Sequence, residues 1–231
     1  METTPTRPPD LRWVRPPRQA RSQETLDRIL DAAEGLIADK GFQDATVAEI
    51  ARRAGSSVGS FYTRFHDKEG LLYALYDRYF EQATATADAA LDPARWEGAG
   101  SAEILRTVTR FLVQVYRDRA GLIRAFVQRN HSDANFQARQ ERLSHYVNDR
   151  LSALLLARVG EIAHPDPARA AAFGLTFTAN TIEAVVLFGE LRSSALALDD
   201  DELAAELARA FLAYLGVADV RSAPSPKKGP A

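Results

Sequence analysis

The chain has 231 residues, of which 46% are apolar and 26% charged, so it is long enough to bury a substantial globular core. It contains no cysteine, which excludes disulfides and thiolate metal sites. The formal net charge is −2, and the longest uncharged stretch, 170–182, is shorter than the roughly 20 residues that a membrane span requires. We therefore expect a soluble cytoplasmic protein without membrane contact, metal or cofactor.

The N-terminal segment differs in composition from the rest of the chain. Residues 1–21 contain five arginines against two acidic residues, together with five prolines, so the remaining chain is net acidic. A basic start on an acidic body indicates DNA contact at one end of the molecule. We consider two interpretations of this segment: an arm that follows the minor groove, and a disordered leader that does not bind.

The residues between the two termini have apolar positions at helical spacing and show no convincing alternating strand. A capping box joins Thr46 and Glu49, and Ser57 and Asp67 can cap the next two helices. Gly41 and Gly55 end helices, and Gly121 is expected to break the helix that starts at 101. The pattern predicts an all-α fold of about nine helices, over 22–40, 46–54, 57–62, a long one from 67, one from 101, 122–129, 134–159, 168–193 and 201–215.

The two short helices around Gly55 have the spacing of a helix-turn-helix. The run from Thr46 to Leu72, TVAEIARRAGSSVGSFYTRFHDKEGLL, is similar to the DNA-binding segment of the TetR family of bacterial regulators. That family shows T-[VI]-x-x-I-A-x-x-A-G-[VS]-S-x-G-[ST]-[LF]-Y-x-[HR]-F-x-x-K-x-x-L, and the resemblance covers residues 20–80. It implies a three-helix DNA-binding domain followed by a helical ligand-binding and dimerisation domain.

The second helix of this motif has to enter the major groove, which is about 12 Å wide. Its outer positions are small or hydrogen-bonding, and Gly59 inside a helix costs about 1 kcal/mol against Ala, which close approach to DNA would explain. The alternative is that Gly59 only permits tight internal packing. Lys68 opposes the dipole of its own helix, which suggests an external anion. The predicted DNA-binding residues are Thr46, Ser57, Val58, Gly59, Ser60, Tyr62, Thr63, Arg64 and Lys68.

Residues Gly55 to Gly59 also match G-x-S-x-G, the nucleophile elbow of serine hydrolases. That elbow needs a preceding strand, whereas a capped helix is predicted here. The four histidines are scattered, and no recognised metal-ligand spacing occurs. A serine hydrolase is therefore the weaker hypothesis, and we expect no catalytic residue.

The resemblance implies a ligand cavity among helices four to seven and a two-fold interface formed by the last two helices. The segment 170–191 is apolar around much of its circumference, which indicates burial on more than one side. Aromatic or polar members of apolar faces are candidate pocket residues, although each one also fits a plain core. They are Trp96, Phe111, Tyr116, Phe126, Asn130, Phe136, Tyr146, Phe177 and Asn180, and the candidate interface residues are Val185, Phe188, Leu207 and Phe211.

We thus expect a disordered arm over 1–20, a helix-turn-helix domain over 21–66, a helical regulatory and dimerisation domain over 67–220 and a disordered tail over 221–231. The leading hypothesis is a homodimeric repressor that a small-molecule ligand releases from a pseudo-palindromic operator in double-stranded DNA. A DNA-binding protein of the same fold that has no inducer is the alternative.

Overall fold

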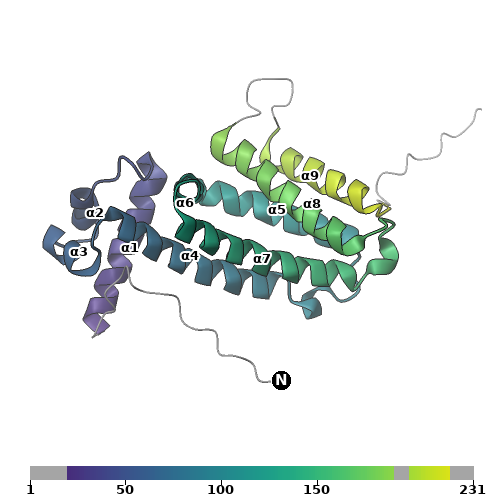
Figure 1. Ribbon diagram of the computed structural model, residues 1–231, viewed down its shortest axis with the longest axis horizontal. Helices are drawn as coiled ribbons and strands as arrows, with labels where there is room; N and C mark the ends of the chain where they lie inside the picture. Colours follow the sequence, from purple (N-terminus) through teal and green to yellow (C-terminus); the bar gives the residue numbers. More distant parts are fainter. Residues whose placement is uncertain (1–19, 190–197, 219–231) are drawn as a thin grey trace, which may run out of the picture. The chain divides into compact units, whose positions relative to one another are not determined.

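The structure is a computed structural model that describes residues 20–189 and 198–218 (Figure 1). Within these residues it contains nine α-helices, which confirms the predicted all-α class. Three short helices of other types, η1 Pro93–Trp96, η2 Val159–Glu161 and η3 Glu183–Phe188, connect or extend them. The α-helices are α1 Ala20–Lys40, α2 Val47–Arg53, α3 Val58–Arg64, α4 Lys68–Ala90, α5 Ser101–Asp118, α6 Ala120–Asn130, α7 Ala134–Leu156, α8 Pro167–Ile182 and α9 Asp200–Leu215.

The chain divides into two compact units. The first comprises the chain up to Thr86 together with Arg119–Ser144, and the second comprises Ala87–Asp118 with the chain from His145 onward. This division differs from the predicted boundary after residue 66, because part of α4, all of α6 and the start of α7 belong with the first three helices. The predicted arm lies outside the described residues apart from Ala20, and the predicted tail lies wholly outside them.

Local side-chain caps start the helices of the first unit as the sequence predicts. Thr46 and Glu49 form a capping box at α2, and the Ser57 hydroxyl accepts the Ser60 N–H at 3.0 Å at α3. At α4, the Asp67 carboxylate accepts the Gly70 N–H at 2.7 Å. These caps fix a short α2–α3 pair whose inner side chains, including Ile50 and Phe61, are buried.

Close packing explains why Gly121 lies inside α6 and does not end a helix as expected. A Cβ atom at this position would lie 2.8 Å from the Ile37 carbonyl oxygen of α1. That distance is too short for any side chain, so α6 approaches α1 through the glycine. The helix break predicted at Gly121 falls instead between Asp118 and Ala120.

In the second unit, α5, α8 and α9 lie side by side around a shared apolar core (Figure 1). Phe211 of α9 is only 1% exposed, and a Cβ atom at Gly174 of α8 would lie 1.9 Å from its ring. The glycine therefore provides the space that the aromatic ring fills. Glu161 supports the start of α5 by accepting the Ser101 N–H at 2.7 Å.

The end of α8 differs from the helix expected over 168–193. The α-helix stops at Ile182, a π-helix continues to Phe188, and Gly189 takes a left-handed conformation with φ of 68°. The whole segment Pro167–Phe188 is long and apolar enough to cross a membrane by length and composition, which the shorter uncharged stretch did not suggest. Its buried face packs against α5 and α9 of the same unit.

Candidate functional site

The outward surface of α3 in the first unit carries small and hydrogen-bonding side chains. Tyr62 is 51% exposed and Val58 43% exposed, and Ser57, Gly59 and Thr63 are also exposed. The inward side chain Phe61 is fully buried and meets Phe65 with 5.1 Å between ring centroids. One side of this two-turn helix is thus fixed in the core while the other side faces outward.

Gly59 lies on this outward side, and no contact within residues 20–189 and 198–218 requires a glycine there. A Cβ atom there would meet only the Ser57 Oγ, at an ordinary 3.8 Å. The packing explanation for Gly59 is therefore wrong, in contrast to Gly121 and Gly174, where neighbouring atoms leave no room. A glycine that weakens a short helix without relieving a clash is consistent with an external surface approaching the backbone.

The predicted contact through the backbone amide of Thr46 has an internal competitor. The Thr46 N–H donates to Glu49 at 3.1 Å, and its hydroxyl donates to the same carboxylate at 2.6 Å. Lys40 completes the cluster by donating to both Glu49 oxygens at 2.7 Å. These donors, with Lys40 foremost, lower the pKa of Glu49 from 4.5 to about 2. Capping thus accounts for Thr46 without DNA.

Lys68 and Arg64, the two cations among the predicted DNA-binding residues, also form hydrogen bonds inside the first unit. The Lys68 Nζ donates to the carbonyl oxygens of Phe42 at 2.8 Å and Gln43 at 2.9 Å, and it lies 4.6 Å from the centroid of the Phe42 ring. These carbonyls account for the position of Lys68 without an external anion, and its contact with a DNA phosphate stays a prediction. Arg64 folds back along α3 and donates to the backbone oxygen and hydroxyl of Ser60, at 3.1 and 3.0 Å.

Arg52 of α2 is a cation near the motif that the structure leaves without an ion pair among the described residues. Its neighbour Arg53 pairs with Asp39 at 2.7 Å, and Lys40 pairs with Glu49, whereas the exposed Arg52 has no such partner. The sequence offered only a weak signal for this difference, because two adjacent arginines look alike until their partners are known.

The G-x-S-x-G segment has the geometry of a helix start. Ser57 follows α2 and the turn after it, and its Oγ accepts the Ser60 N–H. The nearest histidine in sequence, His66, contacts Asp67 at 3.0 Å. A nucleophile elbow requires a strand before the serine. Within the described residues, no group of three or more His, Asp or Glu side chains is arranged to hold a metal ion.

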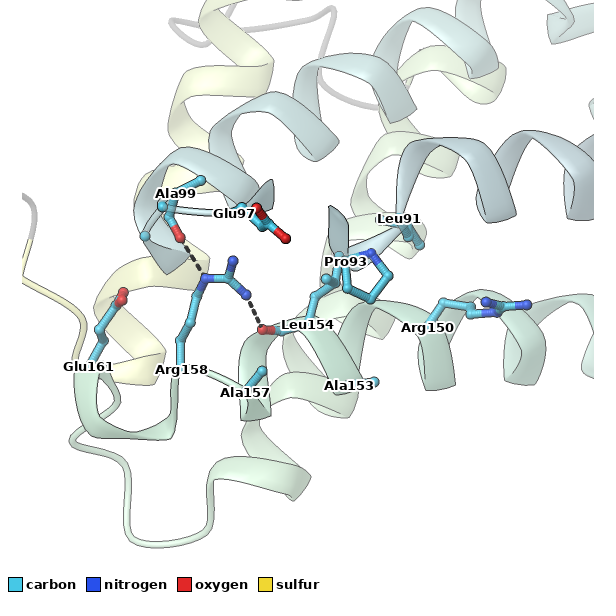
Figure 2. A pocket seen from close by; sticks show the side chains of 12 residues that line it. Leu91, Pro93, Glu97, Ala99, Arg150, Ala153, Leu154, Ala157, Arg158 and Glu161 are labelled. Atoms are coloured by element: carbon cyan, nitrogen blue, oxygen red, sulfur yellow. Dashed lines mark hydrogen bonds between the residues drawn. The ribbon is translucent and has the colours of Figure 1, made fainter. Parts of the chain in front are cut away.

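A cavity of about 630 Å³ opens in the second unit, where α4 ends, α5 begins and α7 ends (Figure 2). Figure 2 shows the Arg158 guanidinium between the Ala99 turn and the end of α7, with Pro93 across the opening. Arg158 donates to the carbonyl oxygens of Ala99, Leu154 and Trp96, at 2.5, 2.8 and 2.5 Å. The apolar lining residues are Leu91, Pro93, Ala99, Ala153, Leu154 and Ala157.

None of the nine predicted pocket residues lines this cavity. Phe126, Asn130 and Phe136 belong to the first unit, and the other six belong to the second. Phe126 and Phe136 are 2% and 0% exposed and pack edge-on against Tyr76, so they form core and not a pocket wall. Phe177 and Asn180 face a separate shallow groove on α8. In the second unit, Trp96 is buried, Phe111 is exposed, and Tyr116 and Tyr146 are half-buried.

That groove on α8 and η3 has a volume of about 400 Å³. Phe173 and Phe177 on its walls are 57% and 44% exposed, and the predicted interface residue Val185 also lines it. Phe188, another predicted interface residue, is 44% exposed. Leu207 and Phe211 are instead 4% and 1% exposed, because they pack inside their own unit. Only the two η3 members of the predicted interface, Val185 and Phe188, thus present accessible surface.

Two family profiles match the chain. The profile described as "Bacterial regulatory proteins, tetR family" matches residues 29–75, and "Tetracyclin repressor-like, C-terminal domain" matches residues 102–215. The first match contains the whole of α2 and α3, and the second extends from α5 to the end of α9.

Curated relatives match shorter segments. The A-factor receptor protein of Streptomyces griseus is 38% identical over 60 residues, which are 26% of this chain and 22% of that protein. The HTH-type transcriptional regulator BetI of Cronobacter sakazakii is 51% identical over 47 residues, 20% of this chain and 23% of that protein. The chain thus matches less than a quarter of the length of these two regulators.

Solved structures show the same fold over most of the chain. SmeT, the repressor of the Stenotrophomonas maltophilia multidrug efflux pump SmeDEF, superposes with a TM-score of 0.61 at 21% identity, covering 91% of this chain and 98% of that one. The regulator FadR of Bacillus subtilis, solved with stearoyl-CoA, has a TM-score of 0.63 at 20% identity and covers 81% and 98%.

Proposed function

Because the chain belongs to the TetR family of DNA-binding transcriptional regulators, we propose that it is a repressor that leaves a pseudo-palindromic operator when a small molecule binds. The observation that carries the DNA-binding part is the outward surface of α3. There, small and hydrogen-bonding side chains surround a glycine that no contact among the described residues requires. Such a surface suits close approach to the major groove.

Within this proposal, the side chains divide by the part of DNA that they reach. The Ser60 hydroxyl accepts from Arg64 at 3.0 Å and keeps its own O–H to donate, and the Thr63 hydroxyl donates to the Gly59 oxygen at 2.8 Å and can still accept, so both short side chains suit base edges. The exposed Tyr62 hydroxyl suits a phosphate. Arg52, which has no ion pair among the described residues, is the second phosphate contact. Thr46, Arg64 and Lys68 act mainly by shaping the motif, because their polar groups already have internal partners.

The test begins by selecting genomic DNA fragments with the purified protein and measuring operator affinity by fluorescence anisotropy. Ser60→Ala and Tyr62→Phe should weaken operator binding without lowering the melting temperature, whereas Tyr214→Phe, an exposed tyrosine on α9, should change neither. If Tyr62→Phe and Ser60→Ala both bind as tightly as wild type, α3 does not read the operator.

Salt dependence separates phosphate contacts from base contacts. Arg52→Gln should weaken binding to all sequences alike and reduce the slope of log affinity against log salt by roughly one unit. Arg53→Gln is the matched control, because Arg53 is engaged with Asp39, and its slope should change less. Equal changes in the two variants would remove Arg52 from the interface.

The ligand-responsive part of the proposal is supported by the cavity in the second unit and by a body larger than DNA binding alone requires. In a two-state mechanism, one state places the recognition helices of the dimer about 34–36 Å apart, and the other misses this spacing. A ligand with a roughly 100-fold preference for the second state supplies about 2.7 kcal/mol. A thermal-shift screen should find a stabilising compound that lowers operator affinity. A DNA-binding protein without an inducer is favoured if every confirmed ligand leaves that affinity unchanged.

The proposed assembly is a homodimer in the cytoplasm. Exposed apolar surface marks interaction sites on soluble proteins. Phe173 and Phe177 line one groove on α8 and η3, and Phe188 is exposed at the end of η3. A dimer interface on this surface would also explain why the segment Pro167–Phe188 is so apolar, without a membrane. We assign no catalytic residue, because Ser57 serves as a helix cap.

A further inference from the structure

We infer that the cavity at the end of α7 binds the carboxylate of an aliphatic amphipathic acid, with Arg158 as its anchor. This inference rests on the proposed ligand response and names the chemical class of the ligand. The volume of the cavity, about 630 Å³, is within the roughly 300–1,000 Å³ that is usual for small-molecule sites.

The Arg158 guanidinium carries a charge that no carboxylate balances within the described residues. A guanidinium has five N–H donors, and three of them meet the carbonyl oxygens of Ala99, Leu154 and Trp96. Carbonyl dipoles orient the group but leave its net charge in place. Two N–H donors therefore remain for an anion, and guanidinium binds carboxylate with strong, charge-assisted hydrogen bonds.

The other charged groups in the lining are already engaged or lie in water. Arg150 pairs with Asp88 at 2.5 Å, and Glu161 accepts the Ser101 N–H at 2.7 Å. Glu97 is exposed and forms no ion pair with another residue in the described part of the chain. The Ser101 N–H leaves the negative charge of Glu161 in place, so the exposed Glu161 and Glu97 both oppose an anion. Because exposed charges are screened more than half-buried ones, both oppose it weakly compared with the attraction of the half-buried Arg158.

The apolar residues that line the cavity indicate which kind of apolar group the ligand carries. Among the residues that the structure describes, six aliphatic side chains or rings and no aromatic one line the cavity, so it suits a saturated chain more than a stacked ring. Trp96 lies next to this wall: its carbonyl binds Arg158, and its buried indole N–H donates to the Ala90 oxygen at 2.8 Å. Its fluorescence is therefore a local reporter of an occupied cavity.

The experiment titrates decanoate and 1-decanol at neutral pH into a Trp13→Phe variant of the full chain, which leaves Trp96 as the single tryptophan. Trp96 emission and calorimetry should show decanoate binding at least about 10-fold tighter than the alcohol, as expected for a charge-assisted pair. Arg158→Gln should abolish this preference. Arg169→Gln, which changes an arginine that is 80% exposed on α8, should preserve it.

Two further variants keep the test informative if Arg158→Gln unfolds. Ala153→Leu fills the cavity and should block decanoate while leaving the arginine, whereas Ala205→Leu, at an exposed site on α9, should not. Glu97→Gln should tighten decanoate binding by removing the opposing charge. Decanoate binding no tighter than decanol, or decanoate binding unchanged in both Arg158→Gln and Ala153→Leu, would overturn the inference.

The outcome can be separated from that of the proposed function, because these titrations contain no DNA. Arg158-dependent binding that leaves operator affinity unchanged would support the site and contradict the ligand response. An induced release of DNA by another compound, with no decanoate binding, would support the ligand response and contradict this site.

Discussion

At the scale of the single residue, Gly59 is the position where stability and DNA binding should respond in opposite directions. Because an added Cβ meets only Ser57 Oγ at 3.8 Å, Gly59→Ala should raise the free energy of unfolding by about 0.5–1 kcal/mol. The same methyl group should obstruct close approach to DNA and weaken operator binding. Urea denaturation and anisotropy measure the two effects. A variant that is stabilised and still binds DNA normally would show that Gly59 has no role at the interface.

Glu49 gives a prediction about protonation. Its pKa is lowered from 4.5 to about 2, chiefly by Lys40 and then by Thr46. A lowered folded-state pKa means that this cluster stabilises the protein above about pH 4.5 and loses that contribution as the pH falls toward about 2. Carboxyl-detected NMR should report the low pKa directly, and Lys40→Met should raise it toward 4.5. A Glu49 pKa that is the same in Lys40→Met would show that Thr46 alone sets it.

The caps at Thr46 and Ser57 could be predicted from the sequence because each involves residues three positions apart. The partners of Lys68 could not be predicted, because the Phe42 and Gln43 carbonyls are 26 and 25 residues away in sequence. Lys68 lies at the start of α4 as predicted, and its observed partners are neutral carbonyl oxygens and not an anion. Arg52 and Arg53 became distinguishable only when Asp39 was located.

At the scale of the element, a buried ion pair joins α4 to α7 inside the first unit. Arg139 and Asp77 form it, with side chains only 9% and 14% exposed. Arg139→Met should lower the free energy of unfolding by about 3–5 kcal/mol, because it leaves a buried carboxylate without its partner. Arg150→Met, elsewhere on α7, removes an exposed pair with Asp88 and should cost no more than about 1 kcal/mol. Urea denaturation of the wild type and both variants measures the two losses in the free energy of unfolding.

The pH dependence of the stability of Arg139→Met tests whether the unpaired Asp77 carboxylate causes the loss. Burial already raises the pKa of Asp77, with Arg139 partly opposing the shift. A raised folded-state pKa means that stability is lost as the pH rises through it, so the defect of Arg139→Met should shrink on acidification. Asp77→Asn combined with Arg139→Met should recover part of the loss at neutral pH. A defect independent of pH would indicate lost packing instead.

Element types followed from apolar spacing, but two local features did not. Gly121 has the residue type that ends helices, yet it lies inside α6 because Ile37 approaches too closely for a side chain. The π-helical end of α8 leaves no mark in the hydrophobic pattern, which continues past Ile182. Short-range pattern therefore predicted the helices, whereas the close approach at Gly121 and the π-helical turn are not encoded in that pattern.

At the scale of the whole molecule, the exposed face of α8 predicts assembly. Phe177→Asp should dissociate the proposed homodimer, because burying an unpaired carboxylate in an interface costs several kcal/mol. Phe111→Asp is the matched control, since it changes a similarly exposed phenylalanine on α5 outside the groove. Multi-angle light scattering should show a dimer for wild type and Phe111→Asp, and a folded monomer for Phe177→Asp. A wild-type monomer at micromolar concentration would refute the assembly.

The DNA-binding motif was predictable as a whole because it is one continuous run of the chain, whereas the cavity was not. Its walls come from 91–100 and 150–161, and its main polar group, Arg158, looks like an ordinary arginine near a helix end. Aromatic residues chosen as pocket candidates, such as Phe126 and Phe136, became core instead. A pattern of residue types cannot distinguish a filled interior from an open one.

The central claim is that two copies of α3, related by a two-fold axis, read two half-sites on one face of DNA. The most direct measurement is anisotropy on the selected operator with about five base pairs, half a helical turn, inserted between its half-sites. The account predicts that affinity falls to that for unrelated DNA, because the second half-site rotates to the opposite face. Retention of full operator affinity after this insertion would contradict it.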